Sequence, residues 1–293
     1  MSSQSKSSTS SSSTTPHLSR FKNPRLVQFP YLFLTSEGLK MNRKAELSFI
    51  KYCNDNNLEK VQAYLTLAED LEVDINAVDD YGDSAAHWAA WNGHTEVTRI
   101  LAATGLVDWN KRNNYGWTPL HVALYRGHFD VAGIIMEQSN IDFSLKIRIS
   151  GWTLAGVAVK MGSTRSVELL AEREDCDSWN IPDNDGDSPF MLAIVRKKKD
   201  SLRVLLNCPR VDPNLKDRSG DSPVMKAIKN EETAMARMLI QCPRVDLATR
   251  DSNGASLEKI ARWEKLNCNK ILIFTWFNST MILGRTDSPR SAT

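Results

Sequence analysis

The chain contains 293 residues with a hydrophobic fraction of 41%, a charged fraction of 25% and a formal net charge of +2. These proportions are ordinary for a folded protein in water, and a nearly neutral chain has no overall field that would attract nucleic acid or a membrane surface. No apolar run reaches the roughly 18 residues that a membrane-spanning helix needs. We therefore expect neither nucleic acid contact nor a membrane partner.

The cysteines point to a reducing compartment. There are five of them, an odd number, and none belongs to a Cys-x-x-Cys pair. Reduced thiols are typical of such a pattern, so the sequence predicts a cytoplasmic and/or nuclear protein.

Residues 1–40 are predicted to be a disordered, basic tail. Almost all of the first fifteen residues are Ser or Thr, and no acidic residue precedes Glu37. A segment of this composition buries too little apolar surface to offset the entropy of ordering it. The same acid-poor, Ser-rich composition is also typical of organellar transit peptides, and Met41 could be an alternative start. These alternatives stay open.

After the tail, a glycine recurs every 34 or 35 residues. The six positions are Gly82, Gly116, Gly151, Gly186, Gly220 and Gly254. Each glycine is followed by one variable residue, then Ser or Thr, then a short apolar block. Self-similarity at this period is the signature of a solenoid or a propeller.

Each period predicts two short helices. The recurring Ser or Thr can accept a hydrogen bond from a free amide of a first helical turn, and Pro119, Pro189 and Pro223 directly follow it, where a missing N–H costs least. A second apolar run with helical spacing comes after a turn, as at residues 97–101 and 131–135. One such helix pair cannot bury its apolar face alone, but a stack of pairs can.

These motifs resemble the ankyrin repeat family. Residues 116–123, GWTPLHVA, followed by Gly127-His128, carry the resemblance, and Gly93-His94 belongs to a second near-complete match. The resemblance covers about residues 45–270. It implies an all-α solenoid of stacked helix-turn-helix units with β-hairpin loops.

The period and the resemblance together divide the chain into a repeat domain at 41–277 and a disordered tail at 278–293. Within the domain we expect a capping unit at 44–78, repeats near 79–110, 111–144, 145–180, 181–214 and 215–249, and a C-terminal cap at 250–277. The third repeat departs from the family pattern because Leu154-Ala155-Gly156 replaces Pro-Leu-His. This departure leaves either a local loss of stability or a bend in the stack as the expectation there.

The histidines, cysteines and acidic residues that could form a catalytic or metal site are better explained by structural roles in the repeat. His87 and His121 occupy the same repeat position, where the family's imidazole ties neighbouring loops together, and His94 and His128 both follow a glycine at a turn. No Cys/His set has the spacing of a zinc site, and the acidic run at 183–187 lacks the closing Glu of a calcium loop. We therefore expect no metal, no cofactor and no catalytic residues, and hence not an enzyme.

Recognition of a partner protein is the function that the resemblance implies. In ankyrin-like stacks the partner surface is built from the hairpin tips and the exposed end of each first helix, so an adaptor, a scaffold or a masking inhibitor is expected, acting as a monomer through its concave face. Trp, Tyr and Arg dominate binding energy at protein interfaces. The residues that hold these places in the first three repeats are Tyr81, Asp83, Trp91, Asn92, Tyr115, Trp117, Tyr125, Arg126, Trp152, Lys160 and Met161.

One dense basic cluster offers an alternative function. Arg196, Lys197, Lys198 and Lys199 could act as a nuclear-import signal, which would suit a nuclear regulator of a transcription factor. The same four residues lie where a turn between two helices is expected, and a turn usually carries solvated charge.

Two further repeated features are a set of asparagines, which could be hydroxylated, and a pentapeptide, which is expected to have a structural role. Asn76, Asn110, Asn180 and Asn214 lie at the position that asparaginyl hydroxylases modify in ankyrin proteins, and Asn214 is the best candidate because Leu206 precedes it by eight residues. The pentapeptide Cys-Pro-Arg-Val-Asp occurs at 208–212 and again at 242–246. Its prolines are expected to end a helix, and its cysteines to lie too far apart for a disulfide.

Overall fold

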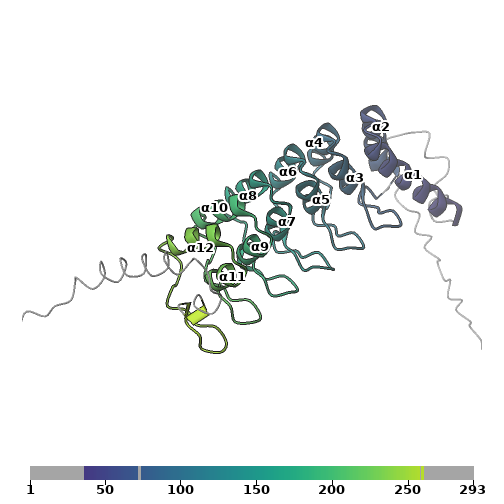
Figure 1. Cartoon of the computed structure of the whole chain (residues 1–293). Coiled ribbons are helices and arrows are strands. Elements are labelled where there is room, and N and C mark those ends of the chain that lie inside the picture. The colour runs from purple at the N-terminus through teal and green to yellow at the C-terminus, as the bar shows by residue number, and fades with distance from the viewer. Residues whose placement is uncertain (1–35, 72–73, 258, 261–293) are drawn as a thin grey trace, which may run out of the picture.

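The computed structural model describes residues 36–71, 74–257 and 259–260, and these form one elongated stack of helix pairs (Figure 1). The helices are α1 (Ser36–Asn54), α2 (Leu58–Leu71), α3 (Ala85–Asn92), α4 (Thr95–Ala103), α5 (Pro119–Arg126), α6 (Phe129–Met136), α7 (Leu154–Met161), α8 (Thr164–Ala171), the 3-10 turn η3 (Ser178–Asn180), α9 (Pro189–Val195), α10 (Lys199–Asn207), α11 (Pro223–Lys229) and α12 (Thr233–Ile240). The predicted all-α solenoid is confirmed.

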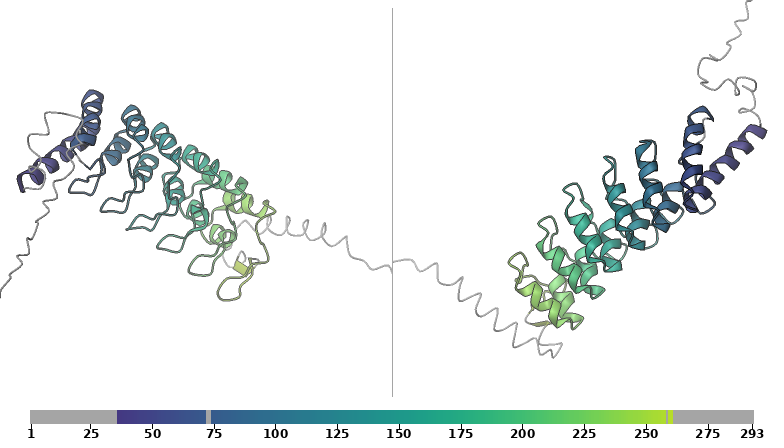
Figure 2. Two further views of the ribbon diagram at one scale, coloured as in Figure 1. Left: turned by 180° about the vertical axis from the view of Figure 1, so that it is seen from behind. Right: turned by 90° about the horizontal axis from the view of Figure 1, so that it is seen from above.

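The helices lie in two rows. The first helices of the repeats, α3, α5, α7, α9 and α11, pack against one another in an inner row, and the second helices form an outer row behind them (Figures 1 and 2). Long loops extend from the inner row, all on one side of the stack. We call the surface made by the inner row and these loops the inner face. Among the described residues, β pairing is limited to the isolated bridges Val78–Ser84 and Arg250–Ser256.

The start of α1 and the range of described residues can be compared with the domain boundaries expected from the sequence. Helix α1 begins at Ser36, ahead of residue 41, where the sequence places the start of the repeat domain. Residues 1–35 and 261–293, which hold most of the two expected tails and the end of the C-terminal cap, lie outside the described residues. None of the described helices is long and apolar enough to cross a bilayer.

The predicted caps start several of the helices. The Thr118 hydroxyl accepts a hydrogen bond from the backbone N–H of His121 at 3.3 Å, and the Ser188 hydroxyl accepts one from Met191 at 3.2 Å. Proline fills the first helical position in α5, α9 and α11. Each inner helix therefore begins at the place that local sequence signals predict.

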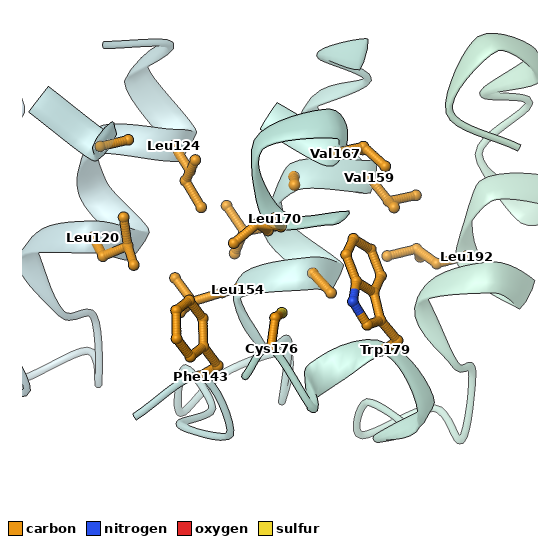
Figure 3. Packing of buried hydrophobic residues seen from close by; sticks show 14 of the residues in the cluster. Leu120, Leu124, Phe143, Leu154, Val159, Val167, Leu170, Cys176, Trp179 and Leu192 are labelled. Atoms are coloured by element: carbon orange, nitrogen blue, oxygen red, sulfur yellow. The ribbon is translucent and has the colours of Figure 1, made fainter. Parts of the chain in front are cut away.

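The core runs through the stack between neighbouring pairs. In the third repeat Leu154 and Leu170 are fully buried, and Trp179 of η3 lies beside Val159 and Leu192 in the same buried cluster (Figure 3). Because each pair buries its apolar side chains against the next pair, the stack stabilises what one pair could not. The third repeat thus keeps the common helix pair despite its unusual Leu154-Ala155-Gly156.

At four junctions of the stack, an asparagine side chain ties the loop that follows an outer helix to the equivalent loop of the next repeat. Asn214 donates from Nδ2 to the carbonyl of Arg244 at 2.9 Å and accepts from the N–H of Asp246 at 2.7 Å. Asn76, Asn110 and Asn180 make the same pair of bonds to the residues 30 and 32 positions later. These side chains satisfy backbone groups that the loops leave free of secondary structure.

The repeated pentapeptide has a structural role that depends on its arginine. Arg244 Nη1 donates to the carbonyl of Cys208 at 2.8 Å and to that of Leu206 at 3.2 Å, at the end of α10. Arg210 Nη2 donates to the carbonyl of Ala171 at 2.6 Å, at the end of α8. A guanidinium at these carbonyls satisfies free acceptors and complements the negative end of the helix dipole.

Candidate functional site

A pocket of about 400 Å³ opens on the inner face between the first and second repeats. Its walls are mainly aromatic, with one valine and a few polar groups. The lining residues are Tyr81, Asp83, His87, Trp88, Trp91, Asn113, Tyr115, Trp117, Val122 and Tyr125. Its size and its mainly apolar walls are those of a ligand or side-chain binding site.

Two inner helices and two loops position these side chains. Trp88 and Trp91 lie three residues apart on α3, so they share one side of that helix. The two loops are held together by hydrogen bonds from Asn114, whose N–H donates to the carbonyl of Tyr81 at 3.1 Å and whose Nδ2 donates to that of Asp80 at 3.0 Å.

Glycine 82 makes this close approach possible. Its φ of 78° lies in the left-handed region, and a Cβ at this position would come within 2.7 Å of Asn114 Oδ1. A larger residue would therefore separate the two loops or strain the turn. The spacing of the loops, and with it the width of the pocket, depends on this glycine.

Several rings of the pocket contact one another or a cation. Trp117 and Tyr125 meet edge to face, with centroids 4.9 Å apart. The guanidinium of Arg126 lies over the ring of Trp91, 4.6 Å from its centroid, and its Nε donates to the carbonyl of Trp91 at 3.3 Å. These contacts limit the rotamers of the rings, so the pocket is largely formed before any partner binds.

The polar groups of the pocket are held by hydrogen bonds between repeats. Asn113 Nδ2 donates to Asp83 Oδ1 at 2.8 Å, and His87 Nε2 lies 3.0 Å from the carbonyl oxygen of Trp117. Burial raises the pKa of Asp83 and lowers that of His87, because it disfavours the charged form of each group. The predicted role of His87, tying neighbouring loops together, is confirmed.

Six of the eleven residues that the sequence selects for partner binding line the pocket: Tyr81, Asp83, Trp91, Tyr115, Trp117 and Tyr125. Asn92 lies outside it and donates to Asn54 Oδ1 of α1 at 2.9 Å. In the third repeat, Trp152 donates from Nε1 to Asp183 Oδ2 at 3.1 Å, and Lys160 Nζ lies 5.2 Å from the Trp152 ring centroid. Arg126 and Met161 are also absent from the pocket lining.

The sequence reasoning missed Trp88, His87, Asn113 and Val122 as lining residues. For Trp88 a signal was present, since it precedes Trp91 by one helical turn. No local signal distinguishes Asn113 or Val122, because their place in the pocket results from the packing of one repeat on the next.

The inner face of the fifth repeat is ionic instead. Lys226 Nζ donates to Asp217 Oδ2 at 2.7 Å, and Lys229 Nζ donates to Asp221 Oδ1 at 2.6 Å. Although burial alone would raise it, the bond from Lys226 holds the pKa of Asp217 below its ordinary value. Both carboxylates are nearly covered, so each depends on its lysine for compensation.

The basic cluster forms the turn between α9 and α10. Arg196 ends the first helix, Lys197 has a φ of 58°, and Lys199 begins the next helix. Lys197 Nζ also pairs with Glu232 Oε1 at 2.7 Å. These four residues therefore form a folded turn and not an extended segment.

The cysteines and acidic residues of the described chain form no evident reactive centre. Across residues 36–71, 74–257 and 259–260, no group of three or more His, Cys, Asp or Glu side chains is arranged to hold a metal ion. Cys53, Cys176, Cys208 and Cys242 are free thiols, and burial raises the pKa of Cys53 to about 12.

The family model for ankyrin repeats (3 copies) matches residues 49–147 and 134–217 of this chain. Acyl-CoA-binding domain-containing protein 6 of Xenopus tropicalis is 32% identical over 59 residues, which are 20% of each chain, so this chain spans about a fifth of that relative's length.

Solved structures of low sequence identity share the fold. The ankyrin repeat domain of Bcl-3, described as a unique member of the IkappaB protein family, has a TM-score of 0.68 at 19% identity, covering 73% of this chain and 93% of that one. The human ASB11 ankyrin repeat domain has a TM-score of 0.57 at 19% identity, covering 83% of this chain and 99% of that one.

Proposed function

The chain belongs to the ankyrin repeat family, and we propose that it is a non-catalytic interaction module that binds a partner protein through its inner face and loop tips. The observation that carries the proposal is the aromatic pocket between the first two repeats. Buried aromatic side chains supply much of the binding energy at protein interfaces. The pocket is the natural centre of the contact.

The preformed shape of the inner face supports this function. The loops are joined by backbone and side-chain bonds, and Trp117, Tyr125 and Arg126 are held by contacts within the stack. A partner therefore meets groups that lose little conformational freedom on binding. Such a module would act as an adaptor, a scaffold or a masking inhibitor, as a monomer in the cytoplasm or nucleus.

Removing exposed rings from the pocket tests the proposal. In the full chain, Trp91→Ala combined with Tyr115→Ala should abolish capture of partners that the wild type retains, since each anchor contributes about 2 kcal/mol or more. Leu106→Ala is the control, because it removes an exposed apolar side chain that neither lines the pocket nor lies at a loop tip. If the pocket variant keeps every partner, binding at this part of the inner face is wrong.

The alternative, a nuclear regulator of a transcription factor that uses residues 196–199 for import, has less support. Import receptors read such basic clusters as accessible stretches, whereas Lys197 is paired with Glu232 and Lys199 belongs to α10. Changing all four residues to Ala and following localisation tests it, and an unchanged distribution contradicts it.

Hydroxylation of Asn214 remains a proposal of its own. The side chain already uses its Nδ2 and Oδ1 to bind the backbone of Arg244 and Asp246, so the enzyme would need this loop to open first. Mass spectrometry of the chain from hydroxylase-competent cells tests it, and an unmodified Asn214 contradicts it.

A further inference from the structure

Two equivalent aspartates of the inner face have different neighbours. In the fifth repeat Asp221 is compensated by Lys229, eight residues later, whose ammonium lies 2.6 Å from Asp221 Oδ1. In the first repeat the same two positions hold Asp83 and Trp91. Asp83 therefore occupies the place of a salt-bridged carboxylate in a repeat that has no lysine to pair with it.

The remaining contacts of Asp83 leave its charge without a cation. Its Oδ1 accepts from the neutral amide of Asn113, and among the described residues no Lys or Arg forms a salt bridge with it. The titratable groups beside it are His87, which burial holds toward the neutral form, and Asp79, which is itself acidic. A partly buried carboxylate in this position favours an incoming positive charge.

The walls around Asp83 suit the same kind of ligand. Six aromatic side chains line the pocket: Tyr81, Trp88, Trp91, Tyr115, Trp117 and Tyr125. The face of an aromatic ring carries partial negative charge and attracts ammonium groups, most strongly at Trp. The pocket, at about 400 Å³, also has room for the apolar stem of a long side chain, which would pack beside Val122.

We propose that this pocket binds a lysine side chain of the partner protein, with its ammonium beside Asp83 where Lys229 supplies one in the fifth repeat. This inference rests on the proposed interaction function. Methylation of the lysine should strengthen binding, because it keeps the charge and makes the ammonium easier to dehydrate against the rings. Asp83 and the six aromatic rings would thus bind the kind of side chain, a lysine, that the first repeat does not contain.

Small probes test the chemistry without knowledge of the partner. The full chain is titrated with Nα-acetyl-lysine methylamide, its Nε-dimethyl form and its neutral Nε-acetyl form, while the indole N–H signals of Trp88, Trp91 and Trp117 are followed by NMR. Saturable shifts at these three signals are expected for the two charged probes, with a dissociation constant on the order of 1 mM for the free lysine derivative. The dimethyl probe should bind several times more tightly, and the acetyl probe should not bind.

Two variants separate the charge from the walls. Asp83→Asn keeps an acceptor for Asn113 and should weaken binding of the charged probes about tenfold. Trp91→Lys gives the first repeat the residue of the fifth, so its own ammonium should fill the site and abolish probe binding. Asp187→Asn, at the equivalent position of the fourth repeat, should leave the affinity unchanged.

The possible outcomes separate this inference from the interaction function itself. Equal binding of the neutral probe would show that the pocket is an apolar site. Tighter binding of an arginine derivative would show that it prefers a guanidinium. Either result, or the absence of binding by every probe, contradicts the lysine proposal. If the probes fail while Trp91→Ala with Tyr115→Ala still loses the partner, the interaction function survives with a different anchor. If the probes bind but that variant keeps its partners, the pocket recognises a lysine side chain that does not belong to those partners, and both partner binding at the pocket and the partner-lysine proposal are wrong.

Discussion

In the first repeat Asp79 accepts a hydrogen bond from the indole of Trp88 at 2.8 Å, and in the fifth repeat the equivalent Asp217 accepts one from the ammonium of Lys226 at 2.7 Å. The acceptor and the backbone frame are the same, but a neutral aromatic donor has replaced a charged one. One end of the inner face is therefore aromatic and the other ionic. The comparison indicates that the fold requires an aspartate at this position of the repeat. The residue that donates a hydrogen bond to it can differ from one repeat to another and can therefore follow function.

The turns between the two helices of a repeat differ in the same way along the chain. Gly93 and Gly127 adopt positive φ in the first two repeats, while Lys197 and Glu231 adopt φ of 58° and 60° in the fourth and fifth. Left-handed backbone costs a residue with a Cβ about 1 kcal/mol relative to glycine. The later repeats thus carry strain that the earlier ones avoid.

The ties between successive repeats also change. His128 Nε2 lies 3.1 Å from the carbonyl oxygen of Trp91 in the preceding repeat, and His94 similarly contacts the carbonyl of Asn54. The fourth and fifth repeats have Lys198 and Glu232 at the histidine position, and their arginines Arg210 and Arg244 bind carbonyls at a different place, the end of the preceding outer helix. The free carbonyls at the ends of inner and outer helices are thus satisfied by different side chains.

The largest expected effect on stability comes from removing the Lys226–Asp217 ion pair of the fifth repeat. Lys226→Met leaves the Asp217 carboxylate covered and without its counter-ion, so the free energy of unfolding should fall by about 2 kcal/mol at neutral pH. Trp88→Phe, the matched change in the first repeat, removes a hydrogen bond from a neutral donor and should cost about 1 kcal/mol. Urea denaturation of the full chain measures both.

Adding Asp217→Asn to Lys226→Met should recover most of the loss, because the buried charge is then gone. Equal losses in the two single variants would contradict the distinction between an ionic and an aromatic end.

The next effect is a pH dependence of stability that arises in the second repeat and has no counterpart in the fifth. Burial lowers the pKa of His121 to about 3, and the fifth repeat has Met225 at that position. Between pH 3 and the unfolded value of about 6.5, the unfolded chain binds a proton that the folded chain does not, so stability falls as the pH falls through this window, by about 1 kcal/mol per pH unit. Denaturation at a series of pH values from 7 to 5 measures the slope.

His121→Met should reduce that slope, and the lowered pKa of His87 should account for part of what remains. A slope unchanged by the substitution would show that His121 does not cause the loss of stability in acid.

The smallest effect concerns the strained turn. Glu231→Gly should raise the free energy of unfolding by about 0.5 to 1 kcal/mol, because glycine adopts positive φ without steric cost. Gly127→Ala is the opposite control, since a Cβ there meets no atom closer than 3.8 Å and only the backbone strain of about 1 kcal/mol is added. Thermal denaturation measures both, and a destabilised Glu231→Gly variant would contradict the strain argument.

Local signals in the sequence were sufficient for the repeat and its helices. The glycine period, the Ser or Thr caps and the prolines place every inner helix from α3 to α11, because each signal acts on backbone groups within one helical turn. The resemblance to ankyrin repeats, carried along the chain by this period, also selects Tyr81, Asp83, Trp91 and Tyr125 as partner-binding residues, since a fixed period puts equivalent positions on the same side of the stack.

The tertiary structure alone decided how those positions combine. It gives Asp221 a lysine but gives Asp83 only the neutral amide of Asn113, and it places the guanidinium of Arg244 on carbonyls of the preceding repeat. The contacts between repeats join residues about one full period apart, and no local pattern encodes which side chains meet across that junction. The period of the chain is therefore a property of its sequence, whereas the chemistry of its inner face arises from the packing of one repeat on the next.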